Sequence, residues 1–170
     1  AFYLFFITLR DFFHRKYRNL SQITAHFSFS ILILSILFNN IFSSEVITNL
    51  KINETYQAQN LKINFESIEQ ENKQNFKAIK GKFIVEDQSG LIEVMQPELR
   101  IYNQPNIVTS EADIKTNIFT DKFMTMNYVQ NQDYFNIRYQ VKPFMIWIWI
   151  STILLCLSGC LSLIRKKYEN

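Results

Sequence analysis

Glycine is scarce in this chain of 170 residues, which contains only three. Phosphate-binding loops need several closely spaced glycines, because the backbone itself must approach the phosphate groups. The sequence also has no Gly-x-Ser-x-Gly segment, the turn that presents the nucleophilic serine of many hydrolases. These absences remove the local signatures of the common soluble enzymes, and we predict no catalytic residue.

Cysteine and histidine are equally few, with two of each. Cys156 and Cys160 are four residues apart in an apolar stretch, and a disulfide across one helical turn has poor geometry. We interpret them as small apolar residues rather than a redox pair. The sequence has no Cys-x-x-Cys-His haem-attachment segment and no metal-ligand cluster. His14 has no second ligand at metal-binding spacing and is predicted to be an ordinary surface histidine.

A large charge excess is also absent, because the net charge is only +3. The basic residues do not gather on one face among aromatics, so nucleic-acid binding is not predicted. Seven of the 18 basic residues lie in two short flanks, before residue 23 and after residue 164, whereas residues 44–143 carry 13 acidic and 11 basic residues. The positive-inside rule therefore places both flanks in the cytoplasm or mitochondrial matrix, and the central segment on the opposite side.

Two apolar runs are long enough to cross a bilayer. Ile23 to Phe42 and Phe144 to Ile164 would each reach about 30 Å as helices, roughly the thickness of the hydrocarbon core. Trp147 and Trp149 lie in the first turns of the second run, either as interfacial anchors or as groups that pack beside a cofactor. Ala1 to Leu9 is apolar but too short to span alone. It is predicted to be an interfacial anchor or the end of a helix begun on another chain.

His26 interrupts the first apolar run about one turn from its start. An imidazole within a spanning helix is costly unless it faces protein or coordinates something, so an intramembrane ionisable residue is a functional hypothesis by default. From the residues alone, His26 is a haem ligand, a proton site or a buried hydrogen-bonding group.

The residues between the two runs alternate apolar and polar side chains. Leu50 to Asn53 and Leu61 to Ile68 show the period of half-buried antiparallel strands, and further short segments follow up to Val141. The polar stretch Glu66 to Gln74 is predicted to be an exposed hairpin tip. The predicted fold is thus a membrane protein in which two transmembrane helices flank a small all-β extramembrane domain, an antiparallel barrel or sandwich.

The predicted domain boundaries follow from these patterns. They are an apolar start and basic segment at 1–22, a first transmembrane helix at 23–42, a β domain at 43–143, a second transmembrane helix at 144–164 and a basic tail at 165–170.

A set of short motifs, in order along most of the chain, resembles the C-terminal part of CcmF, the haem lyase component of cytochrome c maturation. The most specific motif is Lys142-Pro143-Phe-x-x-Trp147-Ile-Trp149, with Leu157-Ser-Gly159 further along the same helix. The others are Ala25-His26, Arg100-x-Tyr102, Thr109 to Ile114, and Thr120-Asp121-x-Phe123. Two positions depart from the family, because its frequent glycine two residues after the histidine is Ser28, and a Gly-Gly pair in the last helix is Ser158-Gly159.

The resemblance implies a role for His26 as one of two axial ligands to a b-type haem within the membrane. It also implies that the second ligand, two further histidines and a tryptophan-rich segment belong to partner chains, since none of them is present here. The implied partners are the other CcmF fragments, a haem chaperone and apocytochrome c, in contact with membrane lipid. Such a chain would not be catalytic alone.

We therefore predict a C-terminal subunit of a split CcmF-like haem lyase that shares haem b with a partner chain. The expected location is the mitochondrial inner membrane, or alternatively a bacterial plasma membrane, as a multi-pass protein. The competing hypothesis is a non-catalytic accessory subunit of a larger membrane complex, such as one of the respiratory chain, derived from the same fold.

Overall fold

A computed structural model describes residues 2–14, 20–58, 61–87, 90–129 and 132–169. The chain forms two compact units: a helical unit of Ala1–Ser43, Asn117–Asp121 and Lys142–Asn170, and a β unit of Ser44–Thr116 and Lys122–Val141. The elements in chain order are α1 (Phe2–His14), α2 (Leu20–Phe42), β1 (Ser44–Leu50), β2 (Thr55–Ala58), β3 (Leu61–Asn72), β4 (Phe76–Asp87), β5 (Ile92–Met95), β6 (Glu98–Tyr102), β7 (Val108–Glu111), β8 (Asp113–Thr116), β9 (Thr120–Tyr128), β10 (Phe135–Pro143) and α3 (Met145–Glu169).

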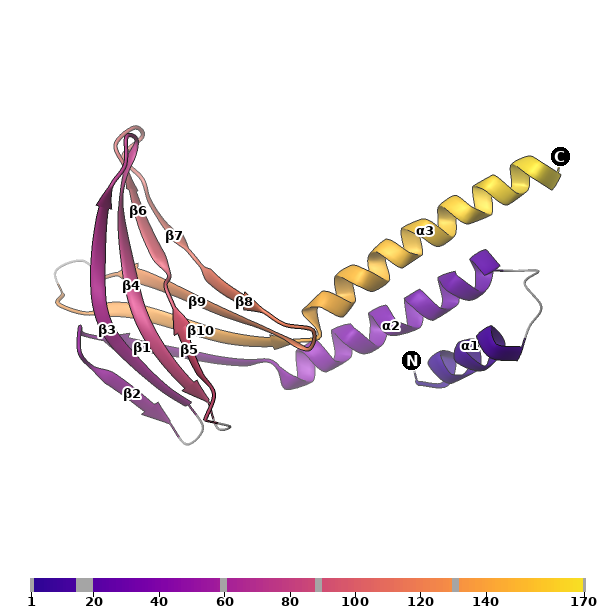
Figure 1. The fold of residues 1–170 in the computed structure, drawn as a ribbon, viewed down its shortest axis with the longest axis horizontal. Coiled ribbons are helices and arrows are strands. Elements are labelled where there is room, and N and C mark those ends of the chain that lie inside the picture. Colours follow the sequence, from indigo (N-terminus) through magenta and orange to yellow (C-terminus); the bar gives the residue numbers. More distant parts are fainter. Residues whose placement is uncertain (1, 15–19, 59–60, 88–89, 130–131, 170) are drawn as a thin grey trace. The chain divides into compact units, whose positions relative to one another are not determined.

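The β unit is built from two sheets (Figure 1). One has four strands in the order β1-β10-β9-β8, and the other has six, with β2-β3-β4-β6-β7 in order and β5 beside β4. The strand pairs whose register is described are antiparallel. Sequence alternation explains which face of a strand is buried. In β3, Ile63 and Phe65 are fully buried, while the preceding residue, Lys62, is exposed. The predicted all-β domain is therefore confirmed.

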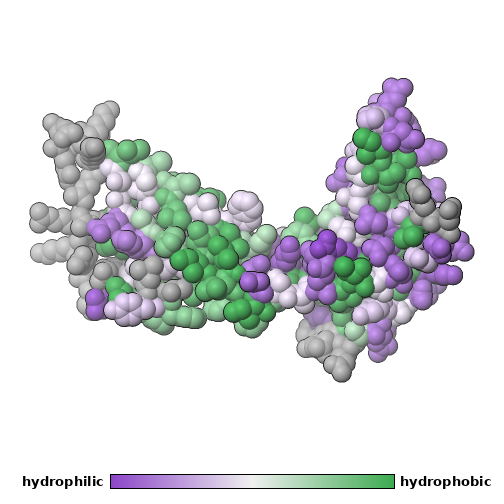
Figure 2. All heavy atoms as spheres, turned by 180° about the vertical axis from the view of Figure 1, so that it is seen from behind, coloured by the Kyte–Doolittle hydropathy of each residue, from purple (hydrophilic) through white to green (hydrophobic). Residues whose placement is uncertain are grey.

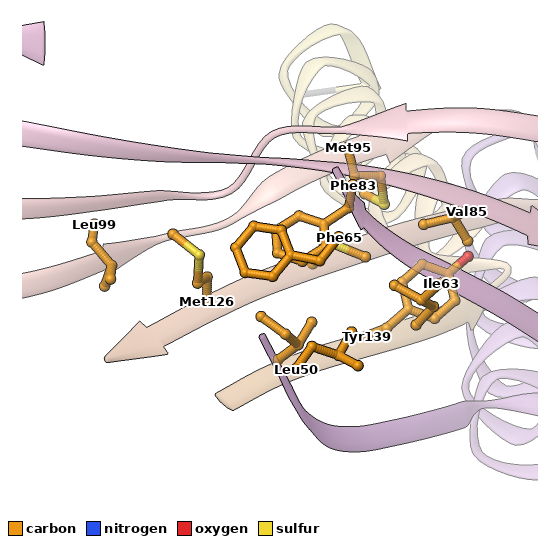
Figure 3. Close-up of a cluster of buried hydrophobic side chains, with 11 residues drawn as sticks. Leu50, Ile63, Phe65, Phe83, Val85, Met95, Leu99, Met126 and Tyr139 are labelled. Carbon is orange, nitrogen blue, oxygen red and sulfur yellow. The ribbon is translucent and has the colours of Figure 1, made fainter. Parts of the chain in front are cut away.

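Side chains from both sheets form one hydrophobic core (Figure 3). Phe65 of β3 stacks on Phe83 of β4 with ring centroids 4.3 Å apart, and Phe135 meets Phe65 edge-on at 5.7 Å. Met124 and Met126 of β9 approach from the other sheet and are fully buried. Methionine suits this position because its flexible side chain fills the space around flat rings.

The first predicted strand is displaced in the structure. β1 begins at Ser44, directly after α2, and ends at Leu50, whereas Lys51 to Glu54 form a turn. The turn is stabilised by the Lys51 amide, which donates to the Glu54 carboxylate at 2.8 Å, and by Asn53, whose φ of 64° is tolerated well by asparagine. Alternation at Leu50 to Asn53 was thus wrong as a strand signal, because local hydrogen bonding overrides it there.

The predicted exposed hairpin tip at Glu66 to Gln74 is correct in its exposure from Glu69 onward and wrong in its extent. β3 continues to Asn72 and β4 starts at Phe76, so only Lys73 to Asn75 connect them. The extension is polar because much of it faces water, and cross-strand pairs support it, such as Lys80 Nζ at 2.9 Å from Glu71 Oε1. The same pair lowers the pKa of Glu71 through the Lys80 hydrogen bond and charge.

A charged cluster links the two sheets at one edge of the core. Lys122 of β9 lies 2.7 Å from the Glu93 carboxylate of β5 and 3.6 Å from that of Asp87 of β4. The neighbouring Tyr139 of β10 is only 3% exposed, and burial, followed by the charges of Glu93 and Asp87, raises its pKa to about 12.

This shift predicts that the β unit loses stability at high pH. The ordinary pKa of a tyrosine hydroxyl is about 10, so the unfolded chain ionises first and the free energy of unfolding falls between about pH 10 and pH 12. The loss of stability from this one group is about 2–3 kcal/mol, because each tenfold change in proton affinity is worth about 1.4 kcal/mol. Urea unfolding of the whole chain in detergent should show a steeper loss above pH 10 than the Tyr139→Phe variant does. Equal pH dependence of the two proteins would contradict the prediction.

The helical unit is centred on an antiparallel pair, α2 and α3 (Figure 1). α2 and the Met145–Ile164 part of α3 are long and apolar enough to cross a membrane. Apolar side chains gather on the surface of the helices, whereas polar ones predominate over the strands (Figure 2). α1 packs along α2, with Phe5 stacked on Phe27 at 5.7 Å between ring centroids.

Small residues form the contact between α2 and α3. Ser28 and Ser35 of α2 are buried, as are Ser151 and Ser158 of α3, and each pair is seven residues apart. A spacing of seven keeps both residues of a pair on one helix face. Among the described helices α3 packs mainly against α2, so we infer that the buried Ser151 and Ser158 face α2. Small residues let the two backbones approach closely, which is the main source of helix association in lipid.

The C-terminal end of α2 and the residues just before α3 are joined by direct contacts. The Asn39 side-chain amide donates to the Pro143 carbonyl at 2.7 Å, and the rings of Phe38 and Phe144 lie 5.3 Å apart. Phe144 has a φ of 60°, unusual for a bulky residue, at the point where the chain changes from strand to helix. Its amide nevertheless has a partner, the Phe119 carbonyl at 2.7 Å.

Candidate functional site

His26 is the seventh residue of α2 and is exposed on the surface of this chain. It belongs to a stripe of exposed residues at helical spacing, formed by Gln22, His26, Phe29, Ile36, Leu37 and Asn40. Ser28, which faces the opposite way, lies about 200° around the helix at 100° per residue. The imidazole therefore points away from α3, toward whatever lies beside this chain.

No other described residue hydrogen-bonds or ion-pairs with the His26 ring. An imidazole without a polar partner raises the free energy of a helix this apolar in a membrane. Coordination of a metal or contact with a polar partner removes this cost. A neutral imidazole is a common axial ligand of haem iron. His26 therefore fits a haem group lying against the exposed face of α2, where Phe29 and, further along the helix, Leu37 supply an apolar surface.

Among the described side chains, no other candidate residue shares a hydrogen bond or ion pair with His26. His14 is the last residue of α1, and its side chain lies outside what the structure describes. Cys156 and Cys160 are free and exposed on α3. Within the described residues there is no group of three or more His, Cys, Asp or Glu side chains that could hold a metal ion.

The two tryptophans of α3 differ in their surroundings. Trp147 is half-buried, and its indole N–H donates to the Ile118 carbonyl at 2.9 Å. Trp149 is 63% exposed. Trp147 thus fastens the turn before β9 to the first turns of α3, while Trp149 is free to meet lipid or another helix.

The acidic residues of the motif Thr109 to Ile114 have structural partners. Glu111 lies 3.7 Å from the Arg100 guanidinium, which also pairs with Glu98 at 2.8 Å. Hydrogen bonds with the Glu98 and Tyr102 side chains raise the pKa of Arg100, burial opposes them, and the charges of Glu98 and Glu111 add to the increase. The Asp113 carboxylate accepts from the Gln96 amide at 2.7 Å. These ion pairs and this hydrogen bond connect neighbouring segments of the β unit.

Sequence reasoning missed an apolar pocket of about 300 Å³ in the helical unit. Its walls come from α1, α2, the turn before β9 and the start of α3, namely Phe5, Phe27, Ile31, Leu34, Ser35, Phe38, Phe119, Phe144 and Trp147. Its phenylalanines are spread from position 5 to position 144, so no local pattern could have identified them. His26 is not among the lining residues, although its neighbour Phe27 is.

Comparison with known proteins identifies relatives of this chain. Residues 41–143 match the family model described as the CcmF C-terminal beta-sandwich. Over 120 residues the chain is 29% identical to "Cytochrome c-type biogenesis protein ccl1" of Rhodobacter capsulatus, covering 71% of this chain and 18% of that protein. Over 145 residues it is 22% identical to "Cytochrome c-type biogenesis protein CcmF" of Pseudomonas aeruginosa, covering 85% and 22%.

A solved structure, "Cytochrome c Heme Lyase CcmF", shares the fold with a TM-score of 0.66 at 15% identity. The match covers 91% of this chain and 27% of that one. The chain spans only about a fifth of the length of the curated relatives given above. The matched region includes both apolar helices as well as the strands, since it leaves only 9% of this chain uncovered.

Proposed function

Since the chain belongs to the CcmF family and carries that family's C-terminal β-sandwich at residues 41–143, we propose that it acts in cytochrome c maturation as the C-terminal subunit of a split haem lyase. The single observation that carries the proposal is His26, an imidazole that has no polar partner among the described residues and lies on the exposed face of an apolar helix. In this role His26 would supply one ligand to a haem b in the membrane, and a partner chain would supply the other.

The bound haem would supply an iron centre able to hold or pass an electron. The chain's own residues do the positioning. The buried serines hold α2 against α3, and the Asn39 amide fixes the last turn of α2 to Pro143. His26 would present an imidazole nitrogen to the iron, and the apolar side chains around it exclude water. The remaining helices, the haem chaperone and apocytochrome c would be supplied or bound by partner chains.

We place the protein in a membrane with two spans, 23–42 and 144–164, a β domain at 43–143 outside, and both flanks, 1–22 and 165–170, inside. A mitochondrial inner membrane or a bacterial plasma membrane satisfies the charge asymmetry, since the basic flanks then lie on the matrix or cytoplasmic side.

This topology predicts a specific protease result. In sealed mitoplasts or spheroplasts, protease added from outside should cut the β unit and spare a tag fused after Asn170. The orientation is inferred from the basic residues that flank the spans. A variant with Lys166 and Lys167 replaced by Gln, in which this topology signal is weaker, serves as a comparison. Removal of the tag with survival of the β unit would mean the opposite orientation.

The function is tested by the absorbance spectrum of the complex purified through this chain. We expect the bands of a low-spin b-type haem, which sharpen on reduction. A stable complex that contains this chain at full occupancy but no haem would exclude the haem-ligand role, and would leave a non-catalytic accessory subunit, for example of a respiratory complex, as the function.

A further inference from the structure

The turn between β8 and β9, residues Asn117–Thr120, has an unusual composition. Its two central residues, Ile118 and Phe119, are 62% and 61% exposed. Exposed turns usually have Gly, Pro, Asn, Asp or Ser at their centre. Large apolar side chains displayed together mark a surface that meets something apolar. We refer to Asn117–Thr120 as the apolar turn.

The backbone of the apolar turn is largely satisfied from within the chain. The Asn117 side-chain oxygen accepts from the amides of Phe119 and Thr120 at 2.9 and 2.8 Å, and the Asn117 amide donates to the Thr120 carbonyl at 3.0 Å. The Ile118 carbonyl accepts from the Trp147 indole at 2.9 Å, and the Phe119 carbonyl from the Phe144 amide at 2.7 Å. A turn can leave water only when such groups are paired, since each unpaired one costs several kcal/mol in lipid.

The partners of the apolar turn lie where the second candidate span begins. Phe144 and Trp147 flank Met145, the first residue of that span, and tryptophan is enriched at the boundary between headgroups and acyl chains. At the same end of the helices Ile41 and Phe42 of α2 are 67% and 61% exposed. All of these residues belong to the helical unit. The apolar surface therefore continues from the spans onto the turn.

From these observations we propose that the apolar turn is a third membrane contact, in which Ile118 and Phe119 enter the headgroup–acyl boundary beside α3 and bind lipid. Lipid suits this surface better than a protein partner. The two side chains offer no charge or hydrogen bond to recognise, and the first turns of α3 also expose apolar side chains, such as Trp149 and Ile150.

The depth of insertion follows from the two groups that lack a partner. Among the described residues, neither the Ile118 amide nor the Asn117 carbonyl has a hydrogen-bond partner. Both need water or a lipid headgroup, which exist at the boundary and not in the hydrocarbon core. The turn is thus a shallow contact, and it does not depend on whether haem is bound.

Depth-dependent quenching of a fluorophore tests this contact. The full chain is prepared as Ile118→Cys with Cys156→Ser and Cys160→Ser, because both native thiols are exposed and would also react. It is labelled with an environment-sensitive fluorophore and reconstituted in vesicles of phosphatidylcholine and phosphatidylglycerol. The matched control is Asn103→Cys in the same background, an exposed residue of a polar turn in the β unit.

For Ile118→Cys we expect emission shifted to shorter wavelength, loss of emission with lipids spin-labelled near the headgroup, smaller loss with a deep label, and none with iodide. Asn103→Cys should show the reverse, with quenching by iodide alone. Quenching of the Ile118→Cys probe by iodide would place the turn in water and overturn the proposal. Short-wavelength emission that neither quencher affects would overturn it too, because the turn would then be packed against protein. Unchanged circular dichroism in both variants establishes that the fold is intact.

Discussion

Replacing His26 with alanine should strip the complex of its haem, or leave the remaining haem high-spin, because one of two nitrogen ligands to the iron is removed. Haem content should fall by at least about tenfold, since loss of even an outer-shell partner of a metal ligand costs about 10–100-fold. The chain should still enter the membrane at normal levels, because alanine makes α2 more apolar. The measurement is the haem absorbance per chain in the complex purified in detergent, and imidazole added to His26→Ala should restore part of it.

The matched control is Gln22→Ala, which removes a polar side chain from the same exposed stripe one turn earlier. It should leave haem content close to that of the native protein. If both variants lose haem equally, the stripe acts in packing against a partner helix and His26 is not an iron ligand. Full haem content in His26→Ala would have the same meaning.

A second large effect is expected at Gly81 in the middle of β4, where alanine should destabilise the β unit by about 1–3 kcal/mol, the usual cost of overpacking a core. A Cβ atom at this position would lie 2.5 Å from Cε2 of Phe83 and 2.9 Å from Sδ of Met126. The Phe83 ring cannot move aside, because it is fully buried and stacked on Phe65. Urea unfolding followed by circular dichroism would measure the change.

Gly159 in α3 provides the same substitution in open surroundings. A Cβ there meets nothing within 4 Å, so Gly159→Ala should be neutral, or stabilise the helix by about 0.5–1 kcal/mol through lower backbone entropy in the unfolded chain. Gly81→Ala should cost less stability in a Phe83→Leu background than in the native protein, since the smaller leucine side chain leaves room for the added Cβ. Equal effects of alanine at both glycines would contradict the assignment of Gly81 to a tight contact.

The sequence was sufficient for the architecture because each part has a strong periodic signal. Two apolar runs marked the helices, and alternation marked the strands that carry Ile63, Phe65, Ile137 and Tyr139. It was less reliable where polar residues continue a strand. Glu69 to Asn72 are exposed, yet they pair with Lys77 to Lys80 because backbone bonds and cross-strand ion pairs sustain the ladder without a buried face.

The candidate site shows a different limit. His26 was identifiable because one ionisable residue in an apolar run is conspicuous by itself. The apolar pocket was not identifiable, since its walls come from four separated segments. The apolar turn has a weaker signal in the sequence, because Ile118 and Phe119 fit a strand as well as a turn. Only the Asn117 side-chain bonds to Phe119 and Thr120 decide between the two.

The serine contact between α2 and α3 also determines how the protein responds to the thickness of its bilayer. If Ser28 faces Ser158 and Ser35 faces Ser151, a slip of one turn would set Leu154 against Ser28 and Trp147 against Ser35, and these larger side chains would force the helices apart. The pair therefore resists sliding and accommodates a thinner or thicker membrane by tilting as one body. His26, about 3 Å along the axis from Ser28 at 1.5 Å per residue, keeps its height relative to α3 in either case.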